Sequence, residues 1–515
     1  MSYLKHVVRG SKYMFNINHN GRCHFFMNCI SIKTALILVS LFSFWSPTIS
    51  HAMKKNSETP TCGKRSVSSQ GKYQVDRTLD VKWNGKEAPS SPSNTPGFGE
   101  DGQNRPMNAY AWAMAPFDDH LYVGVLNRVN DRKAESGDIS EGGEIWRYKP
   151  GVNVNSGSWE PEITQGFTNV NNFGIRILKE YHENLYAGSF NIHDGAELWR
   201  RNKDTKTVKG QWEVIASGGF GDTENDSIRA MAEFNGKLYM GVKNTKSGAS
   251  LYVYDDATGV VSRVDGATDD SIIRADDDVI SELLVHDNYL WIFSWGPNGL
   301  SAYRMDENEK VQFVKNNGIN WQNWDKEDWQ NINAKLKAGR EQDIDFRNSG
   351  IISSSVFNNS IYLGTVNLQN GAQLFKLENP QSENPKDIKW TRLGANVFQP
   401  TERYLWRMQE FKNHLYIGTW NPFKGGKPLK SINNIGSTLY RMDKRENFCQ
   451  IMGDKRLVEE GFNRPENYGI RTMAELNGRL YIGTAQPYKV MPGKDDSAAA
   501  NRKGVEVWEF DGFSK

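Results

Sequence analysis

A unit of roughly fifty to seventy residues recurs along this chain, and this repetition limits the possible folds more than any other feature. The recurring pattern is N-x-x-I-R-x-M-x-x-F-N-G-x-L-Y-x-G-T-x-N, followed after a gap by G-A-E-L-W. Its cleanest copies begin at Asn225 and Asn467. The second position of the recurring L-Y pair falls at Tyr122, Tyr186, Tyr239, Leu290, Tyr362, Tyr416 and Tyr481. The closing element ends at Trp146, Trp199, Tyr252, Tyr303, Phe375, Tyr440 and Trp508. Two independent anchors therefore count the same seven repeats.

Each repeat contains short strand-like runs separated by turns. In the third repeat, IRAMAEF and KLYMGV flank Asn235-Gly236, a dipeptide favoured in two-residue hairpin turns. ASLYVY follows as a third run. A fourth run often starts with an aromatic residue, as at Trp159, Trp212, Phe313, Trp390 and Phe448. Four antiparallel strands in a unit of this length are typical of a β-propeller blade.

We therefore expect an all-β protein, a seven-bladed β-propeller with four-stranded antiparallel blades, over residues 107–515. The last repeat ends at Phe510-Asp511 without a fourth strand. An N-terminal tail, residues 53–106, precedes the propeller. A strand within Tyr73–Trp83 of this tail is expected to complete the last blade, which closes the ring and leaves no free sheet edge.

The repeats resemble kelch-like and related propellers in general plan, over about residues 107–510. They lack the kelch Gly-Gly doublet, the Gly-His and Trp-Asp pairs of WD40 repeats, and the S-x-D-x-G-x-x-W box of sialidases. The F-N-G, L-Y, G-T-x-N and G-A-E-L-W elements are similar to repeats of some secreted bacterial propellers. This resemblance implies the fold and brings no established activity.

The N-terminal residues 1–52 are typical of a signal peptide. Lys33 precedes the apolar run 34–46, and Ser50-His51-Ala52 provides a small-x-small cleavage site. Translation is expected to start at Met27. We expect an exported protein, periplasmic or secreted, without a stable transmembrane anchor, because the run is short for a membrane span. An uncleaved anchor is the alternative.

Cysteine usage fits export. Of Cys23, Cys29, Cys62 and Cys449, only the last two follow the expected cleavage site. Two cysteines in an exported protein can form a disulfide, which would tie the tail to the sheet near Cys449. No C-x-x-C motif occurs, which argues against the common zinc and redox sites.

Charge and motifs exclude several classes of function. The chain has 63 Lys and Arg against 61 Asp and Glu and no basic run, so nucleic-acid binding is not expected. It has no G-x-S-x-G and no phosphate-binding loop. His120, His182, His286 and His414 fall at turns between the first and second strands, and only His193 follows a second strand. We therefore expect neither a metal nor a cofactor.

Two polar positions recur at one end of the repeats. The entry positions, just before each first strand, are Asn108, Asn172, Asn225, Asp276, Asn348, Glu402 and Asn467. The exit positions, after the second strands, are Asn127, Asn191, Asn244, Asn367, Asn421 and Gln486. Four residues after each entry position stand Trp112, Arg176, Arg229, Ile280, Ile352, Trp406 and Arg471. We name the side of the ring with the entry and exit positions the entry face.

These positions have a structural and a functional interpretation. Asn and Asp satisfy backbone groups at turns, and a feature repeated seven times favours architecture. Function is expected where the symmetry breaks, at Asp276 and Glu402. The connections 128–142, 422–435 and 487–503 are long and would form one raised lip on the entry face. An insertion with helix-compatible spacing over Lys326–Arg340 carries Trp321, Trp324 and Trp329, and is expected either to cover the channel mouth or to form a surface helix.

Three functions remain open. The first is an extracytoplasmic propeller that binds a glycan or peptide on the entry face. The expected ligand-binding residues are Asn108, Trp112, Asn172, Arg176, Asn225, Arg229, Asn348, Trp406, Asn467, Arg471, Trp321 and Trp324. The alternative is a carbohydrate-active hydrolase or lyase that uses Asp276 and Glu402, which requires two carboxyl groups about 5–10 Å apart in a deep pocket. A scaffold protein would instead expose an apolar patch. Carboxylates directed into contacts within the blades would favour binding. The sequence leaves the ligand and the oligomeric state open.

Overall fold

The computed structural model describes residues 91–128, 139–264, 273, 277–297, 299–316, 347–395, 397–421, 436–453, 458–487 and 503–512, all within one compact unit. The regular secondary structure of these residues is almost entirely β-strand. The short helical segments are η1 (Pro96–Phe98), η2 (Glu100–Gly102), η3 (Gly218–Gly221), η5 (Pro385–Asp387) and α4 (Glu460–Asn463). Within the described ranges, no helix is both long enough and apolar enough to span a bilayer.

The strands pair in consecutive antiparallel sets, each beginning with a long strand that starts near an entry position. The first strands are β1 (Asn108–Phe117), β5 (Gly174–Tyr181), β9 (Ser227–Phe234), β13 (Val279–His286), β17 (Gly350–Phe357), β21 (Tyr404–Phe411) and β25 (Gly469–Leu476). The second strands are β2 (His120–Asn127), β6 (Asn184–Phe190), β10 (Lys237–Lys243), β14 (Tyr289–Trp295), β18 (Ser360–Val366), β22 (His414–Trp420) and β26 (Arg479–Ala485).

Two further groups of strands lie outside these in each set. The third strands are β3 (Ile145–Lys149), β7 (Leu198–Asn202), β11 (Leu251–Asp255), β15 (Ser301–Met305), β19 (Leu374–Glu378), β23 (Leu439–Met442) and β27 (Val507–Phe510). The fourth strands are β4 (Ser158–Ile163), β8 (Trp212–Ala216), β12 (Val260–Arg263), β16 (Val311–Asn316), β20 (Lys389–Leu393) and β24 (Phe448–Met452). The third-repeat hairpin is therefore confirmed. Each aromatic residue predicted to start a fourth run lies in a strand, but only β8 and β24 begin at that residue.

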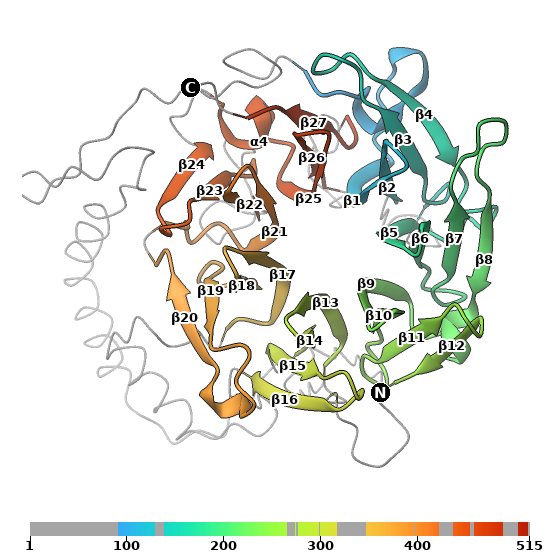
Figure 1. The fold of residues 1–515 in the computed structure, drawn as a ribbon. Coiled ribbons are helices and arrows are strands. Elements are labelled where there is room, and N and C mark those ends of the chain that lie inside the picture. Colours follow the sequence, from blue (N-terminus) through green and yellow to red (C-terminus); the bar gives the residue numbers. More distant parts are fainter. Residues whose placement is uncertain are drawn as a thin grey trace, which may run out of the picture. The chain divides into compact units, whose positions relative to one another are not determined.

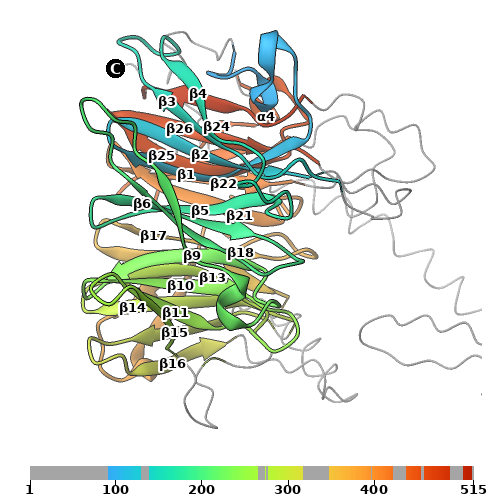
Figure 2. The ribbon, with the colours of Figure 1, turned by 90° about the vertical axis from the view of Figure 1, so that its right-hand side faces the viewer.

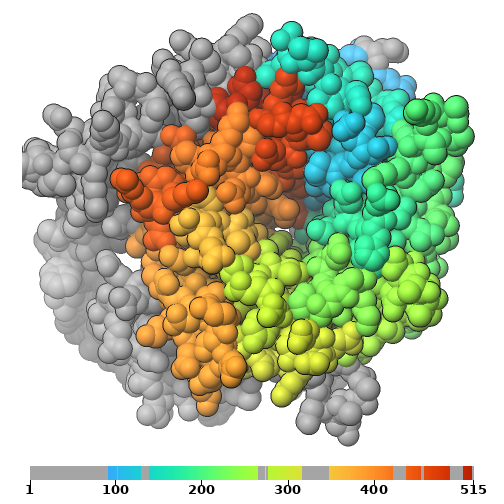
Figure 3. Space-filling model, viewed as in Figure 1, coloured from blue at the N-terminus to red at the C-terminus, as the bar shows by residue number. Residues whose placement is uncertain are grey.

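The first and second strands form a closed antiparallel ring of 14 strands. Each set is joined to the next by a residue pair near the entry face, such as Leu126 with Gly174, and Tyr110 with Ala485 closes the ring. Figure 1 shows the sets arranged around a common centre, and Figure 2 shows the strands running between the two faces. In Figure 3 the blue N-terminal and red C-terminal atoms lie side by side. This all-β architecture is consistent with a β-propeller.

Close approach between sets explains the glycine in the second strand of the repeat. A Cβ on Gly241 would lie 2.3 Å from Cγ2 of Ile280 in the following set. At the closure, a Cβ on Gly483 would lie 2.5 Å from the Cβ of Ala111. Neighbouring sheets can therefore pack this tightly only where a side chain is absent.

The edge of β27 is covered by residues just before β1. The Ser93 amide donates to the Val507 carbonyl at 2.7 Å, and the Val507 amide donates to Asn94 Oδ1 at 2.8 Å. The predicted closing segment Tyr73–Trp83 lies outside the described residues. Cys449 in β24 is disulfide-bonded, and its expected partner Cys62 also lies outside them, so that pairing stays a prediction.

A Gly-Phe pair that precedes several first strands packs on the closing element of the same repeat, and the sequence reasoning did not identify it. Phe167 stacks on Trp199 with ring centroids 4.2 Å apart, and Phe462 stacks on Trp508 at 4.6 Å. Both phenylalanines have positive φ, as does the glycine before each. Each pair thus turns the connection sharply and places an aromatic ring on the closing element of its own repeat.

Candidate functional site

The entry asparagines are buried and hydrogen-bonded within their own sets. Asn467 Nδ2 donates to Glu506 Oε2 at 2.7 Å, and its Oδ1 accepts from Gln486 Nε2 at 2.9 Å. The same link from entry to exit position joins Asn108 to Asn127, Asn172 to Asn191, Asn225 to Asn244 and Asn348 to Asn367. These contacts explain why asparagine recurs. Direct ligand binding by these side chains stays a prediction.

The carboxylate in the hydrogen-bond network of the entry position comes from different positions in different repeats. Beside Asn108, Asn172 and Asn467, it belongs to a glutamate of the closing element. In the β21 set the entry residue is itself Glu402, which accepts from Tyr440 Oη at 2.7 Å, from the Gln399 amide, and from Thr438 Oγ1. The break in symmetry at Glu402 is therefore an exchange of acid and partner within the same buried contact.

Asp277 occupies the corresponding position in the β13 set. Its carboxylate accepts from Tyr303 Oη at 2.6 Å and from Ser301 Oγ at 3.2 Å. The predicted entry residue Asp276 lies outside the described residues. The residue four positions after Asp277 is Ser281. The prediction that Ile280 stands four residues after the entry position of this repeat was therefore one residue out of register.

A β-bulge recurs in every first strand, at the fourth residue after the entry position. In β25, Ile470 pairs with Thr484 and Thr472 with Gly483, which leaves Arg471 as the extra residue. The bulged residues are Trp112, Arg176, Arg229, Ser281, Ile352, Trp406 and Arg471. A bulge redirects its side chain relative to the regular alternation of the strand. The sequence reasoning selected these positions, except Ser281, without identifying their bulges.

Several bulged side chains meet within the ring, in what we name the interior cluster. Tyr110 of β1 contacts Trp406 of β21 with centroids 5.8 Å apart, and Trp295 of β14 contacts Tyr404 of β21 at 5.9 Å. Because these strands are not neighbours in the ring, the contacts cross its interior. The buried members are Ala109, Tyr110, Leu126, Phe173, Phe190, Ile352, Val366, Trp406, Tyr468 and Ala485. Partly buried Trp112, Trp295, Tyr404 and Trp420 pack against them.

Three bulged arginines lie against tryptophans near this cluster. The guanidinium carbon of Arg176 is 4.9 Å from the Trp112 ring centroid, that of Arg471 is 5.2 Å from Trp406, and that of Arg229 is 5.9 Å from Trp295. Arg176 and Arg471 are 5% exposed, and Arg229 is partly exposed. Such cation–π contacts offset part of the cost of removing a guanidinium from water.

These arginines lack ion-pair partners in the described part of the chain. No described carboxylate lies within salt-bridge distance of Arg176, Arg229 or Arg471, and the Nε of each is buried without a hydrogen bond. Burial lowers the pKa of Arg471 to about 9 and that of Arg229 to about 10. Both groups remain charged at neutral pH.

The nearest acidic groups act mainly on Arg229. Asp226 and Glu282 raise the pKa of Arg229 against the larger effect of burial, whereas for Arg471 only Tyr110 does so. Asp226 forms an ion pair with Lys243, and Glu282 accepts from Ser354 Oγ at 3.2 Å. The positive charge of Arg471 is thus less compensated by nearby acidic groups than that of Arg229.

Four residues at this face were missed from the sequence. Trp295 and Trp420 end second strands, and Tyr404 begins a first strand, so an aromatic residue at either point was the available signal. Arg403 follows Glu402, is 6% exposed and has Nε and Nη1 without hydrogen bonds. Predicted Trp321, Trp324 and most of the three long connections lie outside the described residues.

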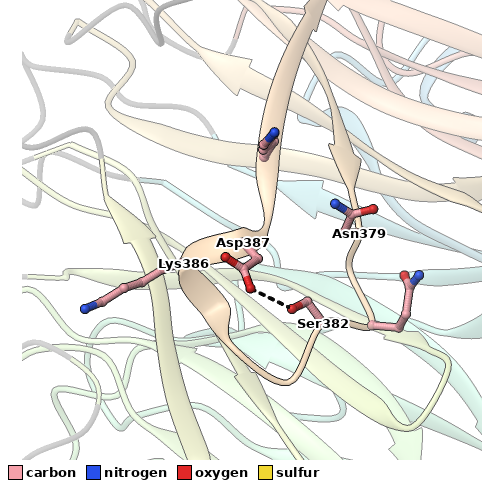
Figure 4. Close-up of a pocket in the computed structure, with 6 residues that line it drawn as sticks. Asn379, Ser382, Lys386 and Asp387 are labelled. Carbon is pink, nitrogen blue, oxygen red and sulfur yellow. Dashed lines mark hydrogen bonds between the residues drawn. The ribbon is translucent and has the colours of Figure 1, made fainter.

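Other candidate sites would be groups of metal ligands and hollows elsewhere in the described residues. No group of three or more His, Cys, Asp or Glu suited to a metal ion occurs there. A hollow beside β19 and β20 is polar and open, and Ser382 Oγ donates to Asp387 at 3.5 Å across it (Figure 4). Its lining comes from the connection between β19 and β20 and from the first residue of β20, namely Asn379, Gln381, Ser382, Lys386, Asp387 and Lys389.

Comparisons with known proteins give no family for the chain. No family model and no curated protein match it. Among solved structures, it is similar to virginiamycin B lyase from Staphylococcus aureus, with 10% identity, a TM-score of 0.43, and coverage of 79% of this chain and 96% of that chain. It is also similar to Sqt1 from Chaetomium thermophilum bound to the N-terminus of the ribosomal protein L10, with 10% identity, a TM-score of 0.41, and coverage of 78% and 97%.

A putative 6-phosphogluconolactonase from Bacteroides uniformis gives 9% identity, a TM-score of 0.39, and coverage of 66% of this chain and 83% of that chain. All three scores lie below 0.5. The architecture described here therefore rests on the strand pairing, and the site on its own geometry.

Proposed function

We propose that the chain is an exported seven-bladed propeller that binds a glycan or peptide on its entry face. The blades would be the strand sets, with the last completed by the segment before β1. The observation that carries the binding role is the interior cluster, whose partly exposed Trp112, Trp295, Tyr404 and Trp420 come from strands far apart in the sequence.

Large aromatic rings contribute contact area with little loss of conformational entropy, and flat faces with polar edges suit sugar rings and peptide side chains. Trp420 packs against Tyr404 with centroids 4.3 Å apart, so the two rings support one another. A preformed surface of this kind lowers the entropic cost of binding.

The enzyme alternative has less support. Glu402 is fully buried in contacts with Tyr440, Thr438 and Gln399, which is the arrangement expected of a structural carboxylate. Asp276 lies outside the described residues. Within those residues, no observation favours hydrolysis or elimination over binding.

A glycan and peptide array probed with the purified protein tests the proposal. Trp420→Ala should weaken binding of any captured ligand by at least about 10-fold, because buried aromatic anchors dominate such sites. Trp324→Ala tests in the same way whether the insertion expected to cover the channel mouth contributes to binding. The matched control is Phe313→Ala on β16, an aromatic residue that is 46% exposed and outside the interior cluster. Absence of binding, or equal loss in Trp420→Ala and Phe313→Ala, would contradict the proposal.

A further inference from the structure

The inner layer formed by the bulges carries a concentration of positive charge. Of its seven described residues, three are arginines and none is acidic: Trp112, Arg176, Arg229, Ser281, Ile352, Trp406 and Arg471. Buried charges in folded proteins are normally paired, because an isolated ion loses its hydration. Two of the three arginines are 95% buried and have an unpartnered nitrogen. A bound anion would supply the partner that the described chain does not.

Several other buried arginines of the molecule are paired with acidic side chains. Arg201 is also fully buried, and it contacts Glu162 Oε1 and Asp204 Oδ1, both at 2.5 Å. Arg464 is paired with Glu506, and Arg479 with Glu509 at 2.7 Å. Arg304, also fully buried, donates instead to the carbonyl oxygens of Pro380 and Glu383. These buried guanidinium groups therefore all have partners, unlike the arginines of the bulged layer and Arg403 beside Glu402.

The geometry points to an oxyanion on a saccharide: we propose that Arg176, Arg229 and Arg471 hold the carboxylate or sulfate of an acidic sugar. This inference rests on the proposed binding function and specifies its ligand. A planar guanidinium presents paired N–H donors to an oxyanion. Trp112, Trp295 and Trp406, which the arginines contact, place apolar faces beside the charge.

A saccharide fits this layer better than an extended peptide. Peptide N–H groups buried against the layer would need acceptors, and the layer presents arginine donors, apolar rings and no carboxylate. Sugar hydroxyls can rotate to accept as well as to donate. The predicted ligand is therefore a uronic-acid or sulfated saccharide with its charged group directed into the ring.

Calorimetric titration at constant ionic strength tests this inference with four probes: a galacturonate oligomer, a sulfated disaccharide, a neutral galactose oligomer and an acidic hexapeptide. We expect one or both acidic saccharides to bind at least about 10-fold more tightly than the neutral oligomer, as charge-assisted hydrogen bonds predict. The two acidic arms distinguish carboxylate from sulfate. Tighter binding of the hexapeptide would overturn the saccharide assignment.

Variants separate this inference from the proposed function. Arg471→Met should reduce binding of the acidic saccharide by about 10- to 100-fold, and Arg471→Lys by less, because lysine keeps the charge without the planar fork. Arg200→Met is the control, since Arg200 is paired with the exposed Glu213. If Trp420→Ala weakens binding while Arg471→Met does not, the anion site is refuted and the binding function stands. If no probe or array ligand binds, both are refuted.

Discussion

Two groups of buried arginines in this protein are treated in opposite ways. Between β4 and β7, Arg201 lies in a network with Glu162, whose side chain is 1% exposed, and Asp204, which also contacts Arg147 at 2.7 Å. In the ring interior, Arg471 is almost as buried and lies against the Trp406 ring, with no described carboxylate within salt-bridge distance. The first arrangement is expected to stabilise the fold. The second is expected to lower the free energy of unfolding, which is typical of functional sites.

The largest effect should come from breaking the paired network. Arg201→Met would remove the nearest cation from Glu162, leaving Lys209 and Arg147, and one of the two arginines from Asp204. Loss of one member of a buried pair costs up to about 3–5 kcal/mol. Urea unfolding measures this loss. Arg200→Met, whose partner Glu213 is exposed, should change stability by less than about 1 kcal/mol. Similar values for both variants would contradict the distinction.

Glu402 extends the comparison to a buried carboxyl group that has no ion-pair partner among the described residues. Burial raises the pKa of Glu402 to about 7, against hydrogen bonds from Thr438 and Tyr440 that lower it. Between pH 4.5 and 7 the folded state therefore holds more protons than the unfolded state, so stability falls as pH rises, by roughly 3 kcal/mol across that window. Urea unfolding at several pH values should show that Glu402→Gln removes this slope. An unchanged slope would refute the assignment.

Removing hydrogen bonds of the entry asparagines should also lower stability according to the partner that is lost, by a smaller amount. Asn467→Ala removes a donor to the buried Glu506, whereas Asn225→Ala removes one to the neutral Tyr252 hydroxyl. We expect Asn467→Ala to cost about 1–3 kcal/mol and Asn225→Ala less, because a hydrogen bond to a charged acceptor is stronger than one to a neutral hydroxyl. Thermal unfolding of both variants at pH 7 measures the difference. The reverse order would contradict this explanation of the repeated asparagine.

The smallest effect, and one of opposite sign, is expected in the ring interior. Arg471→Met removes an unpaired buried charge and keeps an apolar side chain against Trp406. Without ligand it should stabilise the protein by about 1 kcal/mol, the cost of the unsatisfied donor less the cation–π contact. Urea unfolding of the ligand-free variant is the measurement. A loss comparable to that of Arg201→Met would show that Arg471 is structural.

The strand architecture could be predicted from the sequence because local signals agreed with one another. Asn235-Gly236 has positive φ at both residues, as the hairpin dipeptide requires, and the repeated glycine of the second strand marks close packing between sets. The predicted closing strand Tyr73–Trp83 lies outside the described residues, and the contacts of Ser93 and Asn94 with β27 were not predicted. No local pattern reports which part of a tail meets a distant edge.

The site could be predicted only in part. The positions of Arg176, Arg229 and Arg471 followed from counting along the repeat, but their lack of acidic partners depends on contacts across the ring. The departure at Glu402 suggested chemistry, whereas the structure shows an exchange with Tyr440 and Thr438. A single sequence cannot distinguish a carboxylate that is available for catalysis from one that has exchanged places with its contact partner, because the distinction depends on contacts in three dimensions.

One measurement tests the central claim, that the ring interior keeps an arginine unpaired in order to bind an oxyanion. The free energy of unfolding of the wild-type protein and of Arg471→Met should be compared in chloride and in sulfate at equal ionic strength. We predict that the variant is the more stable in chloride and that sulfate, by binding the folded wild type, reduces or reverses this difference. The same difference in both salts would contradict the account.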